Sequence, residues 1–381
     1  MKNFIKALYA DLLDRVNYVI TELRSNKFHA DIQDRFINDT VAEFEEIKKD
    51  LEHAFKTGVL EHELITRNNI FRFNRLHREY KGIHSYRYLA LRNYKDPEIF
   101  LFRIISQIYR EHRISAIPPI VCTISNQDDY YWAVPDFEII ALPAGEEKSL
   151  LNLPDLYHEI GHLLDAMFKG KSSEKTGKII DRHFAGEIVR LIDDGFPTQA
   201  DTVKETRRQW SEGWLEEFTC DLVGTYMTGA AYAWTNLKLL TIGHGSTQIY
   251  EYLDTHPADE ARMRIIILML EKLGLVKEKN AVESAWALFL KDTHPYKPSD
   301  YDLLFPQQLL KEMVHEFYEF YQNADLVSYP ELQHAGDNSI AGMLNKAWMV
   351  AQSDPMDYFS FETTAIKSLR RAFGVDGQSG T

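Results

Sequence analysis

The chain has 381 residues, of which 45% are hydrophobic and 26% charged, so it can form one large domain or two to three smaller ones, each with its own core. Its formal net charge of −14 argues against a general nucleic-acid-binding protein, because neutralising phosphates requires a basic surface. Its two cysteines cannot build a disulfide framework, and with the acidic balance they predict a cytoplasmic protein.

The first part of the chain, residues 1–113, has the periodicity of helices. Apolar residues recur at helical spacing from Phe4 to Leu23. A further helix is expected from Pro97 to His112, with proline near its start and a broad apolar face. Asp11 and Asp14 interrupt the first apolar stretch, so no signal peptide is predicted there. We expect residues 1–113 to form a helical N-terminal region.

Within this region, residues 67–95 interleave arginines with aromatic residues. Such a pattern can stack on and neutralise single-stranded nucleic acid. In an acidic protein it more often forms an amphipathic surface whose arginines pair with carboxylates. We therefore expect no nucleic-acid partner.

Three short strands are predicted next. Residues 114–125 are β-branched and interrupted by prolines, which is typical of an edge strand. Residues 130–134 and 137–142 are expected to form two more strands, joined by a Pro-Asp turn. From Leu153 onward the pattern is helical again. The longest strongly apolar run, Ile265 to Leu270, is too short to cross a bilayer, so no membrane insertion is expected.

These elements predict an α+β fold that is predominantly helical. A core made of a small sheet and the helices of the active site is expected over residues 114–275. A helical C-terminal region is expected over residues 276–381.

The first helix of that core carries a metal-binding motif, YHEIGHLLD. His158 and His162 are four residues apart and therefore share one face of a helix, where both imidazoles can bind one zinc ion. Glu159 is placed to act as a general base, taking the proton of a metal-bound water. Gly161 leaves space behind the helix. A chance match on an ordinary helix is the alternative.

A third ligand is found in the segment WLEEFTCDLVGTYMTG. Glu217 and Asp221 are again four residues apart, so Glu217 can complete a three-ligand zinc site, and Asp221 can accept the free N–H of a ligand histidine. We favour Glu217 over Glu216 because only Glu217 has an aspartate four residues later. Cys220 is expected to be a small buried residue.

HEIGH followed by EFTCD resembles the HExxH…ExxxD pattern of the gluzincins, the thermolysin-like clan of zinc metallopeptidases. The resemblance implies a zincin-like core and one zinc ion per chain, bound by His158, His162 and Glu217, with Glu159 as base. It also implies that the strand FEIIALP pairs with an extended peptide or protein substrate. The gap between His162 and Glu217 is longer than in thermolysin, so an extra helix, around Lys178–Ile192, is expected there.

A later segment, YLDTHPADEARMR, is similar to the THP…R signature of HtpX-type and CAAX-prenyl-protease-type peptidases. That similarity implies that His256 stabilises the oxyanion formed on the scissile carbonyl and that Arg262 or Arg264 supports the site. The alternative is that Thr255, His256 and Pro257 simply begin a helix.

Two other functions remain open. A second Glu-x-x-His pair would allow the di-iron site of a ferritin-like oxidoreductase. The residues of that site would be Glu159, His162, Glu187, Glu217, Glu312 and His315. This alternative leaves His158 and Asp221 without a role, and His315 is expected on the surface of a helix. A binding protein that keeps the zincin fold without its activity is the third possibility, against which the intact Glu159 argues.

Overall fold

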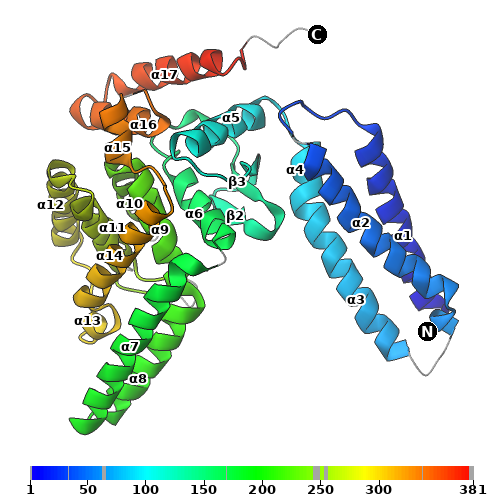
Figure 1. The fold of residues 1–381 in the computed structure, drawn as a ribbon, viewed down its shortest axis with the longest axis horizontal. Coiled ribbons are helices and arrows are strands. Elements are labelled where there is room, and N and C mark those ends of the chain that lie inside the picture. The colour runs from blue at the N-terminus through cyan, green and yellow to red at the C-terminus, as the bar shows by residue number, and fades with distance from the viewer. Residues whose placement is uncertain are drawn as a thin grey trace.

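The computed structural model describes residues 2–32, 34–61, 66–168, 170–242, 249–252, 256–336 and 338–376. Most of these residues are helical, and a single sheet lies among the helices that they form (Figure 1). Its strands are β1 (Ile120–Ser125), β2 (Trp132–Val134) and β3 (Ile139–Pro143). The prediction of a mainly helical α+β protein is confirmed.

The sheet has the order β1-β3-β2, with β1 parallel and β2 antiparallel to β3. The expectation that the FEIIALP strand pairs with substrate is therefore wrong, because β3 has a neighbour on both sides and no free edge. Every residue of β3 is buried, as in a strand covered on both faces. Among the described residues, the strands at the edges of the sheet are β1 and β2.

The sheet separates two hydrophobic cores, because successive side chains of a strand point to opposite faces. Ile120 and Ile139 point into the smaller core, and Val121 and Ile140 point into the larger one. The smaller core is otherwise built by the N-terminal helices. These are α1 (Lys2–Ser25), α2 (Asp34–Lys56), α3 (Thr66–Ile83) and α4 (Leu89–Arg92).

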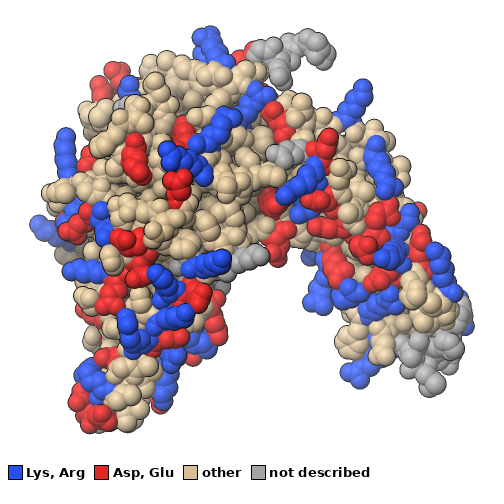
Figure 2. All heavy atoms as spheres, in the orientation of Figure 1, with Lys and Arg blue, Asp and Glu red and all other residues tan. Residues whose placement is uncertain are grey.

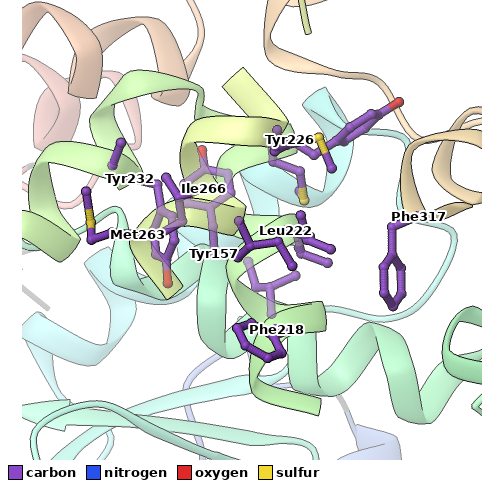
Figure 3. Close-up of a cluster of buried hydrophobic side chains, with 14 of the residues drawn as sticks. Tyr157, Phe218, Leu222, Tyr226, Tyr232, Met263, Ile266 and Phe317 are labelled. Atoms are coloured by element: carbon purple, nitrogen blue, oxygen red, sulfur yellow. The ribbon is translucent and has the colours of Figure 1, made fainter. Parts of the chain in front are cut away.

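The larger core contains the helices that carry the predicted site, which pack through Tyr157, Phe218, Leu222 and Ile266 (Figure 3). These helices are α6 (Asp155–Met167), α9 (Leu215–Thr228), α10 (Ala230–Ile242) and α11 (Asp259–Lys272). Helix α5 (Asp96–Glu111), which lies within the region expected to be N-terminal, also packs into this core.

C-terminal helices also pack on the larger core (Figure 1). They are α12 (Val276–Thr293), α13 (Tyr301–Leu304), α14 (Gln307–Asn323), α15 (Tyr329–Ala335), α16 (Ile340–Ser353) and α17 (Tyr358–Ala372). In the described parts of the chain, none of the helices combines the length and apolar character that crossing a bilayer requires.

The insertion between α6 and α9 is larger than predicted, with two helices instead of one. Helices α7 (Lys171–Asp193) and α8 (Pro197–Gln209) pack against each other and extend from the body as one arm, while α1, α2 and α3 form another (Figure 1). The molecular surface is hollowed between these arms (Figure 2).

Candidate metal centre

Two helices supply the candidate metal ligands and approach each other closely. His158 and His162 lie on α6, and Glu217 lies on α9. A β-carbon on Gly161 would lie 2.8 Å from the Cα atom of Cys220, which is closer than real β-carbons come to a backbone atom. Glycine at this position therefore allows α6 and α9 to pack as tightly as they do.

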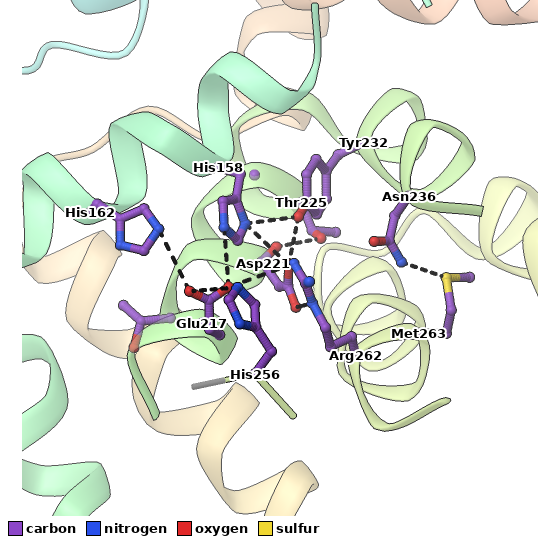
Figure 4. A network of polar contacts seen from close by, with 12 residues as sticks. His158, His162, Glu217, Asp221, Thr225, Tyr232, Asn236, His256, Arg262 and Met263 are labelled. Atoms are coloured by element: carbon purple, nitrogen blue, oxygen red, sulfur yellow. Dashed lines mark hydrogen bonds and ion pairs between the residues drawn. The ribbon is translucent and has the colours of Figure 1, made fainter. Parts of the chain in front are cut away.

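The side chains of these three residues converge (Figure 4). Nε2 of His158 lies 3.4 Å from Oε2 of Glu217, and Nε2 of His162 lies 3.8 Å from Oε1 of the same carboxylate. Two imidazole nitrogens and one carboxylate are the donor set of many catalytic zinc sites, in which a fourth position stays open for water or substrate. The chemistry of this donor set fits a zinc ion.

Carboxylates also hold the other ring nitrogen of each histidine. Nδ1 of His158 lies 3.2 Å from Oδ1 of Asp221, as predicted, and 3.0 Å from the hydroxyl of Tyr232. That hydroxyl donates a hydrogen bond of 2.5 Å to Asp221. Nδ1 of His162 lies 2.9 Å from Oε1 of Glu216. Partners of this kind fix the tautomer that leaves Nε2 free for a metal.

Neither Tyr232 nor Glu216 was expected in this role. Tyr232 comes from α10, and the only sequence signal for it is indirect. A β-carbon on Gly224 would lie 2.9 Å from the tyrosine ring, so the glycine makes room for Tyr232 beside α9. For Glu216, the sequence signal is its position next to Glu217.

Of the two candidate arginines, Arg262 is the one that reaches the site. It binds Asp221 through two hydrogen bonds, Nε to Oδ2 at 2.8 Å and Nη2 to Oδ1 at 2.7 Å. Arg264 instead pairs with Glu260 at 2.9 Å.

His256 lies at the edge of the same cluster. Its Nε2 atom is 3.8 Å from Oε1 of Glu217, and its side chain is 53% exposed. Thr255, the first residue of the THP segment, lies outside the described residues. The geometry therefore brings together all seven residues predicted for the site. They are His158, Glu159, His162, Glu217, Asp221, His256 and Arg262.

The buried charges shift one another's ionisation. Burial alone would lower the pKa of His158, but Asp221 and Glu217 raise it to about 10. Burial opposes the ionisation of Glu217, yet His158, Arg262 and His162 lower its pKa to about 2. The pKa of Glu159 is raised, mainly by burial. The two carboxylates therefore favour the protonated form of His158.

Cys220 is a second possible partner for a metal. Ligand atoms of His158, His162 and Cys220 all lie within 4.8 Å of one another, so this group could hold a metal ion. The thiol, however, is fully buried against Gly161 and is not among the side chains that line the cleft. Burial also holds its pKa well above 9, whereas a metal binds the thiolate. We therefore favour the carboxylate of Glu217, which lines the cleft.

The candidate ligands line a cleft of about 770 Å³. Trp132 and Ala133 of the edge strand β2 form part of its wall. Helix α6 packs against this strand. Strand β2, and not β3, therefore borders the cleft.

The remaining residues of the di-iron alternative lie elsewhere. His315 is on the exposed face of α14, where Nδ1 contacts the ammonium group of Lys272 at 2.9 Å. Glu312 lies 3.8 Å from Arg182, and Glu187 pairs with Arg190 at 2.5 Å. None of the three lines the cleft. The geometry gives no support to a two-iron centre.

Comparison of the chain with models of known protein families, with curated proteins and with solved structures gives no match.

Proposed function

We propose that this protein is a zinc-dependent metallopeptidase. The observation that carries the proposal is the convergence of His158, His162 and Glu217 in a cleft that also contains Glu159. The carboxylates at the Nδ1 atoms of both histidines support it further, because metal-binding histidines usually have such partners.

Each residue has a defined task in peptide hydrolysis. A bound zinc ion would polarise the scissile carbonyl and lower the pKa of a bound water to about 7. Glu159 takes a proton from the attacking water and delivers it to the leaving amine. Its raised pKa suits a group that must both accept and release a proton. His256 donates a hydrogen bond to the oxyanion.

The free edge of β2 supports a peptide as substrate. An extended peptide can add to an exposed strand through main-chain hydrogen bonds. Strand β2 is only three residues long, so it can align a short segment beside α6. We therefore expect cleavage of extended or flexible peptide segments.

The first test is elemental analysis of the purified wild type beside Glu217→Ala and His315→Ala. We expect one zinc ion per chain in the wild type and in His315→Ala, and loss of zinc in Glu217→Ala. Glu159→Gln should keep its zinc and lose cleavage of a mixed peptide library read by mass spectrometry, by a factor of at least about 100.

Other outcomes would overturn the proposal. Two iron ions per chain, lost in His315→Ala, would favour the oxidoreductase. A chain that binds no metal would favour a non-catalytic binding protein. Retention of zinc in Glu217→Ala and its loss in Cys220→Ser would identify the thiol as the third ligand.

A further inference from the structure

The cleft contains a buried carboxyl group that the proposed chemistry does not use. Asp155 is the first residue of α6, three residues before His158, and only 6% of it is exposed. Residues three apart on a helix share a face, and both side chains line the cleft. Among the described residues, Oδ2 of Asp155 has no hydrogen-bond partner. A buried oxygen without a partner is costly, so this oxygen is available to accept a hydrogen bond from a ligand in the cleft.

Two tyrosine hydroxyls lie in the same part of the cleft. Tyr130 and Tyr131 directly precede β2, and their ring centroids are 4.6 Å apart. The hydroxyl of Tyr130 interacts with the carboxyl of Asp155, and among the described residues that of Tyr131 has no hydrogen-bond partner. Three oxygens that can accept hydrogen bonds are thus grouped there. A ligand with several N–H donors would satisfy them together.

The charge around Asp155 favours a cation. Glu146 lines the same cleft. Burial raises the pKa of the Asp155 carboxyl to about 7, and a cation beside it would favour its charged form. The lysine and the arginine of the described lining are bound elsewhere, and His158 lies between Glu217 and Asp221. Lys238 donates to Asn152, and Arg262 binds Asp221. Neither forms an ion pair with Asp155.

We propose that Asp155, together with Tyr130 and Tyr131, binds a cationic nitrogen of the substrate. An ammonium group has up to three N–H donors. Its bond to a carboxylate is charge-assisted, and aromatic rings attract cations. The nitrogen is either the α-ammonium group of a peptide or the side chain of a basic residue near the cleaved bond. The inference deepens the proposed function and rests on it, since Asp155 lies one helical turn from His158.

The test uses three ligands that differ in their cation. They are the hydroxamates of norleucine, with an α-ammonium group, of Nα-acetyl-lysine, with a side-chain ammonium group, and of Nα-acetyl-norleucine, with neither. Each is also measured as the plain amide, which needs no metal to bind. Calorimetry gives the dissociation constants for the wild type and for Asp155→Asn. Asp128→Asn is the matched control, because it removes the same charge from an exposed position on the cleft.

We expect one cationic ligand to bind the wild type about tenfold or more tightly than the neutral one. Asp155→Asn should abolish this preference, Tyr131→Phe should reduce it, and Asp128→Asn should keep it. The preferred ligand identifies the source of the nitrogen. Thermal unfolding of each variant shows that it is folded.

Equal binding of all three ligands by the wild type would overturn the inference, as would a preference that survives in Asp155→Asn. The metallopeptidase proposal fails separately. If the protein binds no zinc but still binds a cationic amide more tightly than the neutral amide, the role of Asp155 stands and the metallopeptidase proposal is rejected.

Discussion

The two candidate histidine ligands are oriented by acidic residues of α9. Asp221 lies at Nδ1 of His158, and Glu216 lies at Nδ1 of His162. Asp221 is fully buried, and Arg262 and Tyr232 bind it from other helices. This network sets the position and basicity of His158 without contacting a metal. The hydroxyl of Tyr232 should therefore affect metal affinity more than it affects the fold.

Tyr232→Phe tests this expectation. The variant removes the hydroxyl that bonds Asp221 and leaves the buried ring in place. We expect zinc affinity, measured by competition with a chelator, to fall about tenfold. The control is Tyr226→Phe, which removes another buried hydroxyl, bonded to the carbonyl of Leu326. Equal zinc affinity in the two variants would contradict the role given to Tyr232.

Metal binding should release a proton from His158. Its pKa of about 10 in the metal-free protein lies above the ordinary value of about 6.5. A protonated His158 thus stabilises the fold fully below pH 6.5, and this contribution is lost as the pH rises through about 10. Zinc requires the neutral ring and replaces the proton.

Calorimetry at pH 7.5, in buffers of different ionisation enthalpy, should give about one proton or more released per zinc ion. Zinc affinity should rise about tenfold per pH unit between pH 6.5 and 8. A proton count near zero would mean that His158 is already neutral between its two carboxylates.

The sequence is informative for residues whose spacing alone places them together. His158 and His162 share a helix face, as do Glu217 and Asp221, so their roles follow from a repeat of four. Tyr232 is 74 residues from His158, and only the packing of α10 on α9 brings them together. No periodicity encodes that contact. Asp155 was not predicted as a site residue, because an acidic residue at the start of a helix is already explained by its favourable interaction with the helix dipole.

The site depends on how closely α6 and α9 approach each other. Gly161→Ala would place a methyl group against the backbone of Cys220 and push the helices apart. We expect a loss of about 1–3 kcal/mol in the free energy of unfolding, although alanine favours helix formation. Zinc affinity should fall as well, because His158 and His162 lie on one helix and Glu217 on the other.

Gly177→Ala is the matched control in α7. A β-carbon there would have no atom within 4 Å, so only helix propensity changes, and stability should rise by about 0.5–1 kcal/mol. Denaturant unfolding and zinc titration of both variants give the comparison. A stabilised Gly161→Ala with unchanged zinc affinity would show that α6 and α9 need not be this close.

The sequence predicted which segments form helices and strands, but it did not predict which of them lie next to each other. The apolar run of β3 correctly indicates a buried strand. Such a strand is usually central in its sheet and has neighbours on both sides, so it cannot pair with a substrate. Strand β2 spans three residues of intermediate burial, which is too short a pattern to reveal an edge. The long gap between His162 and Glu217 predicted one inserted helix, which corresponds to α7, whereas the mostly polar α8 was not predicted.

The sheet joins the two hydrophobic cores of the molecule. Alternate residues of β1 and β3 belong to the N-terminal helices on one side and to the helices of the candidate site on the other. Loosening one core therefore exposes a face of the same strands that support the other. We expect the two cores to unfold in one cooperative transition, although they are built from different segments of the chain.

Phe44→Ala tests this coupling. Phe44 lies on α2 and is fully buried in the smaller core. It is remote in sequence from every proposed ligand. Truncation should cost about 3–5 kcal/mol, and calorimetry should show a single transition at a lower temperature. Excess zinc should raise that temperature for the whole molecule, since a ligand of the folded state stabilises everything that unfolds with its site.

Phe4→Ala is the control. This side chain is 61% exposed, so the substitution should change the free energy of unfolding by no more than about 0.5 kcal/mol. If Phe44→Ala instead gave two transitions, with only the upper one responding to zinc, the N-terminal helices would be a separate folding unit. The shared strands would then be an interface between two domains and not the middle of one.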